Sequence, residues 1–230
     1  MIKQLNSILW KEFKNIKRNM KIQMISYTGI TVLFCIILFA KSLLLGKEIN
    51  PTIINNFIQY SLIIIGYMSF LSNIKFWQEK SLKTLESLFA TPIPLKILIL
   101  GKVLAPTIFS VICIGIYYII FGLLMAFILA INSFNILNLL FPLIISILFN
   151  ILFGIINAYG MWCASAALAK LLQLISLGLY LLSIIPVFMI TAKNNISDFN
   201  FAYFFIILSI LSIYCLVRCN KEKAITTLYE

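Results

Sequence analysis

The sequence predicts an all-α membrane protein with six transmembrane helices. Its residues are 62% hydrophobic and only 11% charged, and its mean hydropathy is +1.06. A soluble domain of this composition would expose a large apolar surface. The apolar runs are unbroken rather than alternating with period two, which favours helices over barrel strands. About 20 mainly apolar residues cross a bilayer core, and six stretches reach that length: 24–45, 53–74, 97–130, 137–169, 171–191 and 201–219.

The positions of the basic residues predict the orientation. Of the 18 Lys and Arg residues, fifteen fall on one side of the expected topology and three on the other. The positive-inside rule then places both termini and the segment 77–102 in the cytoplasm, with an even number of spans. The expected location is the plasma membrane of a bacterium. The net charge of +11 is therefore mainly a topology signal that also suits anionic lipid headgroups, and no nucleic-acid partner is expected. Residues 23–219 form one transmembrane domain, and residues 220–230 form a cytoplasmic tail.

Residues 1–22 predict an amphipathic helix that lies along the inner leaflet. On a helical wheel the apolar residues gather on one side and six basic residues gather opposite. A signal peptide is the alternative, but the polar stretch is too long and no small-residue cleavage site follows the first span. The apolar side contains Ile2, Leu5, Ile8, Leu9, Phe13, Ile16 and Met20.

The segment between the second and third spans predicts a short cytoplasmic helix. Its apolar residues have the spacing of one helix face, and its charged residues include a Glu79 and Lys83 pair that supports a helix by about 0.2–0.5 kcal/mol. Pro92 and Pro94 should end this helix near Thr91. The face consists of Leu82, Leu85, Leu88 and Phe89, and the other charges are Lys80, Glu86, Lys96 and Lys102.

The third and fourth spans carry residues that affect helix packing. Pro106 predicts that residues 95–105 form a separate turn or a kinked piece. Small residues spaced four apart let helix backbones approach closely in a bilayer. In the fourth span these pairs are Gly160 with Ala164, and Ser165 with Ala169.

Polar residues also mark one face of the fourth span. Asn150 and Asn157 are seven residues apart, with Gly154 between them. One interpretation is a polar stripe that faces a translocation path. The other is interhelical hydrogen bonding that packs the bundle.

The five cysteines, an odd number, include no pair outside the expected spans, so no disulfide framework is predicted. Cys215 and Cys219 are four residues apart and could hold a metal or accept an acyl chain. The chain has no His, and the nearest acidic residue is Glu222. Small apolar packing residues are therefore the favoured interpretation. The other cysteines are Cys35, Cys113 and Cys163.

Residues for catalysis are missing. The chain has no His, no GxSxG, no HExxH and no phosphate-binding loop. Ion-coupled carriers usually need ionisable groups at membrane depth, whereas all seven acidic residues lie outside the apolar cores. We therefore expect a non-enzymatic chain without catalytic residues, metal ligands or a cofactor of its own, driven by an external motor. The acids are Glu12, Glu48, Glu79, Glu86, Asp198, Glu222 and Glu230.

The segment 77–102 resembles the cytoplasmic segment between the second and third spans of type-two ABC exporter permeases. The similarity extends to six spans, cytoplasmic termini and a basic N-terminal helix, and so covers almost the whole chain. Lys83 stands where that family often has Gly, and Ile93-Pro94 where a hydroxyl residue is common. The matching residues are Glu79-Lys80, Thr84-Leu85-Glu86, Leu88, Thr91-Pro92 and Gly101-Lys102.

The resemblance implies that residues 77–94 contain a coupling helix seated in a groove of a separate ATPase subunit, which binds ATP and Mg. It also implies that residues 1–22 form a connecting helix and that the chain pairs with a second permease copy or paralogue. The implied cargo is a drug, peptide or lipid-like molecule. The implied coupling residues are Glu79, Lys80, Leu82, Thr84, Leu85, Glu86, Leu88, Phe89, Thr91 and Pro92.

Three alternatives stay open. A haem-exporter or cytochrome-maturation permease has a similar segment. A membrane scaffold or immunity protein would need no transport activity, and copurification with an ATPase would separate it from an exporter. A small ion-coupled carrier is the third, and the lack of acids at membrane depth counts against it.

Overall fold

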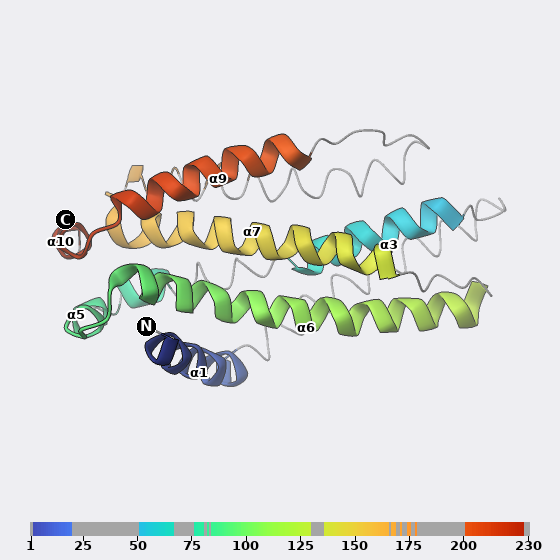
Figure 1. The fold of residues 1–230 in the computed structure, drawn as a ribbon, viewed down its shortest axis with the longest axis horizontal. Helices are drawn as coiled ribbons and strands as arrows, with labels where there is room; N and C mark the ends of the chain where they lie inside the picture. Colours follow the sequence, from blue (N-terminus) through green and yellow to red (C-terminus); the bar gives the residue numbers. More distant parts are fainter. Residues whose placement is uncertain are drawn as a thin grey trace.

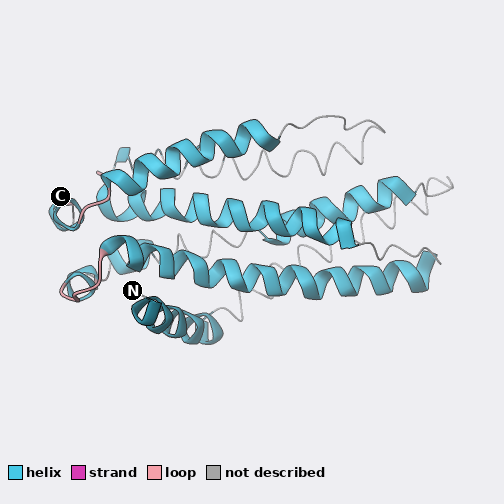
Figure 2. Ribbon diagram, viewed as in Figure 1, coloured by secondary structure: helices cyan, strands magenta, loops and turns pink. Residues whose placement is uncertain are grey.

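The fold is helical throughout the part of the chain that the structure describes. Figure 2 shows helices joined by short loops, and no strand occurs among the described residues. The all-α class is thus confirmed for this part. The expected first span, 24–45, and most of the fifth, 171–191, lie outside it. The computed structural model describes residues 2–19, 51–66, 76–80, 82, 84–129, 136–165, 167–168, 171, 174–175, 178 and 201–227.

Two of the described helices are long and apolar enough to cross a membrane. They are α6 (Leu95–Leu129), through its stretch Leu95–Leu123, and α7 (Ile136–Cys163), through Leu139–Cys163. The helix α9 (Phe201–Arg218) adds a shorter apolar stretch. These lengths and compositions suggest membrane association.

The helix α7 is the centre of the described bundle. It packs against α3 (Pro51–Gly66), α6 and α9, and Figure 1 shows α6, α7 and α9 running lengthwise beside one another. Large side chains of α7, among them Phe149, Phe153 and Trp162, are almost fully buried. A continuous apolar core therefore runs along α7.

The N-terminal helix α1 (Ile2–Asn19) packs against α6. A Cβ atom at Gly101 would lie 2.7 Å from Cγ2 of Ile8 and 3.5 Å from Cδ1 of Leu5. Only a residue without a side chain allows this approach. The helix predicted for residues 1–22 is thus present as α1, and part of its apolar face contacts α6.

Two short helices meet at one end of the bundle. They are α5 (Leu85–Phe89) and α10 (Lys221–Thr226). Both ends of the described chain also lie there (Figure 1). We call this region the α5 end.

The expected end of the short helix is confirmed, because α5 stops at Phe89 before Pro92. Its start differs from the expectation. The backbone N–H and the hydroxyl of Thr84 both donate to the carbonyl of Glu79, five residues earlier, at 3.1 and 3.2 Å. This wider turn separates the helical residues 76–80 from α5, so Leu82 lies in a turn rather than on the α5 face.

The longer helices also differ from expectation. Residues 95–105 are not a separate turn, because α6 continues through Pro106. The fourth span was expected to reach residue 169, but α7 ends at Cys163. At this end the hydroxyl of Thr227 donates to the Trp162 carbonyl at 2.8 Å. It thereby pairs one of the carbonyls that a helix C-terminus leaves free.

Candidate functional site

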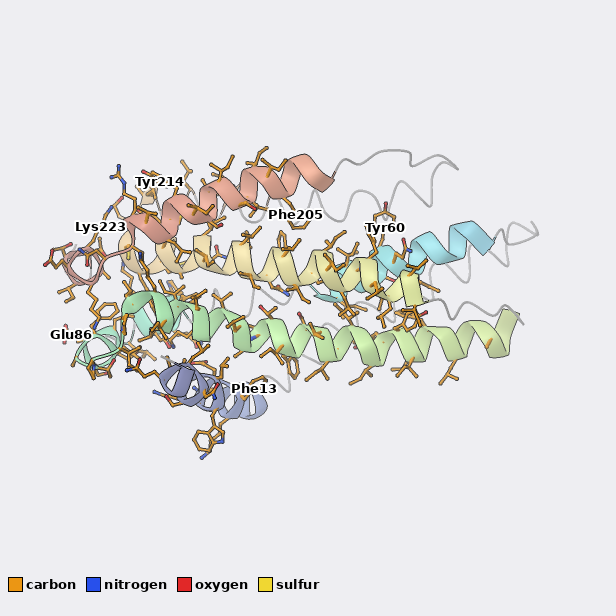
Figure 3. All side chains as sticks on the ribbon, viewed as in Figure 1. Phe13, Tyr60, Glu86, Phe205, Tyr214 and Lys223 are labelled. Carbon is orange, nitrogen blue, oxygen red and sulfur yellow. The ribbon has the colours of Figure 1, made fainter. Side chains whose placement is uncertain are left out.

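The helix α5 has a buried side and an exposed side. Leu85 is fully buried and Phe89 is 8% exposed. Glu86 and Ser87 are exposed, and Leu82 in the preceding turn is 71% exposed. Figure 3 shows Glu86 on the outer side of α5, directed away from the long helices. Among the described residues 82–89, the exposed side of α5 and the turn before it therefore present one large apolar side chain, Leu82, and one acidic side chain, Glu86.

The buried side of α5 is fixed on Trp162. The ring of Phe89 meets the Trp162 ring edge-on at 6.0 Å, and the ring of Phe76 does so at 4.9 Å. Such pairs add about 0.5–1.5 kcal/mol each beyond their buried area. The Trp162 indole also donates to the Phe76 carbonyl at 3.3 Å. The Trp162 side chain of α7 thus contacts the segment before α6 at two points, Phe76 and Phe89.

The C-terminal helix α10 holds α5 from the other direction. The ammonium group of Lys221 donates to the carbonyls of Phe89 and Thr91, each at 3.1 Å. These carbonyls lie at or just beyond the C-terminus of α5, where the carbonyl groups have no N–H donor from the helix itself. The ammonium of Lys223 in turn donates to the Tyr159 hydroxyl of α7 at 3.1 Å. Two lysines of α10 therefore connect α5 to the core helix.

A buried ion cluster joins three segments at this end. The ammonium of Lys102 on α6 lies 3.1 Å from a carboxylate oxygen of Glu12 on α1, and it also pairs with Glu79. The side chains of Lys102 and Glu12 are 6% and 4% exposed. Removing one partner from such a cluster leaves a buried charge uncompensated. The cluster thus fixes α1 and residues 76–80 to the start of α6.

This ion cluster was missed from the sequence. The sequence pattern predicted a Glu79 and Lys83 pair and placed Lys102 in the Gly101-Lys102 match, but it did not predict that Glu79 and Lys102 pair with each other. The usable signals were a lysine inside the apolar third span and a single acid, Glu12, in an otherwise basic helix. Both are costly to bury alone, which favours pairing them.

The expected coupling residues divide by exposure. Leu82, Thr84, Glu86 and Pro92 are exposed, and Leu85 and Phe89 are buried against the bundle. Between these extremes are the half-buried Glu79, Lys80, Leu88 and Thr91. Lys83 lies outside the described residues. Only the exposed group could meet another protein without a movement of α5.

The expected path residues lie inside the described bundle. The amide nitrogen of Asn150 donates to the Gly66 carbonyl at 2.6 Å and to the Ser110 hydroxyl at 3.0 Å. Its contacts therefore link α7 to α3 and α6. A Cβ atom at Gly154 would lie 2.7 Å from a methyl group of Val103 on α6. Asn157 is buried, and its amide nitrogen has no hydrogen-bond partner among the described residues. The translocation path stays a prediction.

The expected packing pairs are only partly within α7. Gly160 and Ala164 are buried, but Ala164 follows the end of the helix. Ser165 is exposed, and Ala169 lies outside the described residues. The structure therefore describes one buried small pair at the α5 end, and the second pair stays a prediction.

The closest cysteine contact differs from the one that the sequence spacing singled out, which was Cys215 with Cys219. Cys219 lies 3.0 Å, sulfur to sulfur, from Cys163, which is 56 residues away in the chain. Spacing along one helix could not reveal this contact. In the part of the chain that the structure describes, no group of three or more His, Cys, Asp or Glu residues could hold a metal ion.

Comparisons with protein-family models, with curated proteins and with solved structures found no match.

Proposed function

We propose that this chain is the membrane subunit of an ATP-driven exporter, similar to type-two ABC exporter permeases. In this proposal it crosses the plasma membrane six times and has both termini in the cytoplasm. It pairs with a second permease copy or paralogue, and a separate ATPase subunit binds ATP and Mg. The transported molecule is a drug, a peptide or a lipid-like compound.

The observation that carries the proposal is the two-sided arrangement of α5. Leu85 and Phe89 anchor the helix in the core, whereas Glu86 and the adjacent Leu82 are exposed. Lys221 holds the C-terminal end of α5. A force applied to the exposed side would pass through rigid contacts to α7 and α10. This is what a helix that transmits ATPase motion requires.

The ion cluster supports a second transmission route. Lys102 lies near the start of α6 and contacts Glu12 of α1 and Glu79 of residues 76–80. Movement of the segment before α5 would therefore pull on both α1 and α6. In the proposal, α6 and α7 belong to the transport bundle, so the motion reaches the path through two connected helices.

The missing energy source also supports the proposal. The buried acidic residue in the described part is Glu12, and it pairs with Lys102. A carrier driven by protons or sodium would need an ionisable site at membrane depth. An external ATPase meets the energetic need that the sequence leaves open.

The test is copurification from native membranes in mild detergent. We expect the chain to bring down a phosphate-loop ATPase, and Glu86→Arg to reduce the recovered ATPase at least tenfold. Glu222→Arg is the matched control, because it makes the same charge change at an exposed residue of α10. Equal ATPase recovery from both variants, or no ATPase with the unmodified chain, would contradict the proposal.

A further inference from the structure

Two buried thiols meet at the α5 end without any role in the proposed function. Cys163 is the last residue of α7, and Cys219 directly follows α9. Their sulfur atoms are 3.0 Å apart, a hydrogen-bonding distance. Both cysteines are free thiols. They are therefore a dithiol between two helix ends.

Cys163 is fully buried, and its sulfur is in hydrogen-bond contact with the sulfur of Cys219. The thiolate is the nucleophilic form of cysteine, so a small oxidant must reach this buried pair for a reaction to begin. Cys219 is 7% exposed and its neighbour Asn220 is exposed, so the connection between α9 and α10 is the approach for a small oxidant.

We propose that Cys163 and Cys219 form a redox-active dithiol that a peroxide closes to a disulfide. Cys163 gives its proton to a water molecule, its thiolate attacks one oxygen of hydrogen peroxide, and the O–O bond breaks to leave a sulfenic acid on Cys163. The released hydroxide takes that proton back from the protonated water, which gives the first product water. The Cys219 sulfur then attacks the sulfenic sulfur. The S–S bond forms, the S–O bond breaks, and the leaving hydroxide takes the Cys219 proton as a second water. The two sulfurs lose two electrons in total, and the peroxide gains them.

The geometry makes the second step short. A disulfide has a sulfur separation of about 2.05 Å, so the two sulfurs need to approach by about 1 Å from their present distance of 3.0 Å. Cys215 is also buried, four residues earlier on α9, but the observed sulfur contact of Cys163 is with Cys219. The structure therefore selects one pair among the described cysteines.

The disulfide would tie α7 to the segment that carries α10. Lys221 of α10 binds the end of α5, and Thr227 binds the end of α7. Oxidation should therefore hold α10 and α5 against the bundle. Any effect on transport rests on the proposed function, whereas disulfide formation does not. In a reducing cytosol the resting form would be the dithiol, and the disulfide would be transient.

The test uses the full chain in lipid nanodiscs treated with hydrogen peroxide and then with N-ethylmaleimide. Peptide mapping without reductant should find Cys163 linked to Cys219, and dithiothreitol should reverse the link. The link should be lost in Cys163→Ser and Cys219→Ser but kept in the matched buried controls Cys113→Ser and Cys215→Ser. The unmodified chain supplies the main result, so a poorly folded variant does not decide it. Full alkylation of both thiols after peroxide, or a link to Cys215 instead, would overturn the proposal.

A second measurement tests whether the Cys163–Cys219 disulfide also holds α10 against the bundle. Hydrogen exchange of residues 221–227 should slow at least threefold after oxidation of the unmodified chain and stay unchanged in Cys163→Ser. A disulfide that forms without this slowing would overturn the locking of α10. Copurification of an ATPase is a separate readout, so failure of the proposed function would be distinguishable from failure of the dithiol.

Discussion

The ammonium group of Lys102 lies 3.1 Å from the Glu12 carboxylate, although 90 residues separate them in the chain. Lys102 also pairs with Glu79. One cation of α6 therefore holds the N-terminal helix and the segment that leads to α5. The stability of the α5 end should depend on this lysine more than on any exposed one.

Replacing Lys102 tests this dependence. Lys102→Met leaves Glu12 and Glu79 without their buried cation, and we expect a loss of about 3–5 kcal/mol. Lys96→Met is the control, because Lys96 is on the same helix and exposed. Thermal unfolding in detergent micelles measures both. Equal midpoints for the two variants would show that the ion cluster does not stabilise the fold.

Gly101 should be required for the docking of α1. In Gly101→Leu the new side chain would collide with Ile8, so we expect α1 to leave α6 and its amides to exchange at least tenfold faster. Gly115→Leu is the matched control, since a Cβ atom at Gly115 meets nothing within 4 Å. Hydrogen exchange of residues 2–19 is the measurement. Unchanged protection in Gly101→Leu would argue against the observed packing of α1.

Replacing two leucines near α5 should affect different properties: one replacement should lower the stability of the fold, and the other should weaken ATPase binding. Leu85 is fully buried, whereas Leu82 is 71% exposed. We expect Leu85→Ala to cost about 2–5 kcal/mol of stability and Leu82→Ala to cost less than about 0.5 kcal/mol. In the proposed complex, Leu82→Ala should instead weaken ATPase binding. Unfolding and copurification, measured on the same preparations, distinguish the two roles, and a reversed pattern would refute the assigned faces.

Lys221 should stabilise the helical conformation of α5. Lys221→Met removes the donor to the carbonyls of Phe89 and Thr91, and we expect faster exchange across residues 85–91. A hydrogen bond from a charged group contributes about 1.5–3 kcal/mol. Its loss corresponds to a rise in the amide exchange rate of roughly tenfold to hundredfold. Arg218→Met, an exposed cation at the end of α9, is the control. The same exchange in both variants would rule out the proposed support.

Local chemistry made several features predictable from the sequence. The apolar runs predicted the long helices α6 and α7, because each run has the length and composition of a membrane-spanning helix. The prolines after Thr91 predicted where α5 ends, since each lacks an N–H and pushes the preceding residue away from helical geometry. The amphipathic pattern predicted α1. Each of these signals acts over a few residues and needs no tertiary contact.

Features that depend on long-range contacts were not predictable. The pairing of Glu12 with Lys102 and the meeting of Cys163 with Cys219 join residues that are far apart in the chain. The start of α5 was misplaced because the turn from Glu79 to Thr84 uses a five-residue hydrogen bond. The face containing Leu85 was expected to meet a partner. In the structure Leu85 is in the core and Glu86 is exposed.

The most direct test of the proposed coupling is photocrosslinking from position 87 in native membranes, with Glu86 kept. A photoreactive amino acid replaces Ser87, an exposed residue of α5. The control chain carries it at Ile210, an exposed residue of α9. We predict that position 87 crosslinks to a protein with a phosphate-binding loop and that position 210 does not. Crosslinks from position 87 only to lipid, or only to proteins without such a loop, would contradict the account.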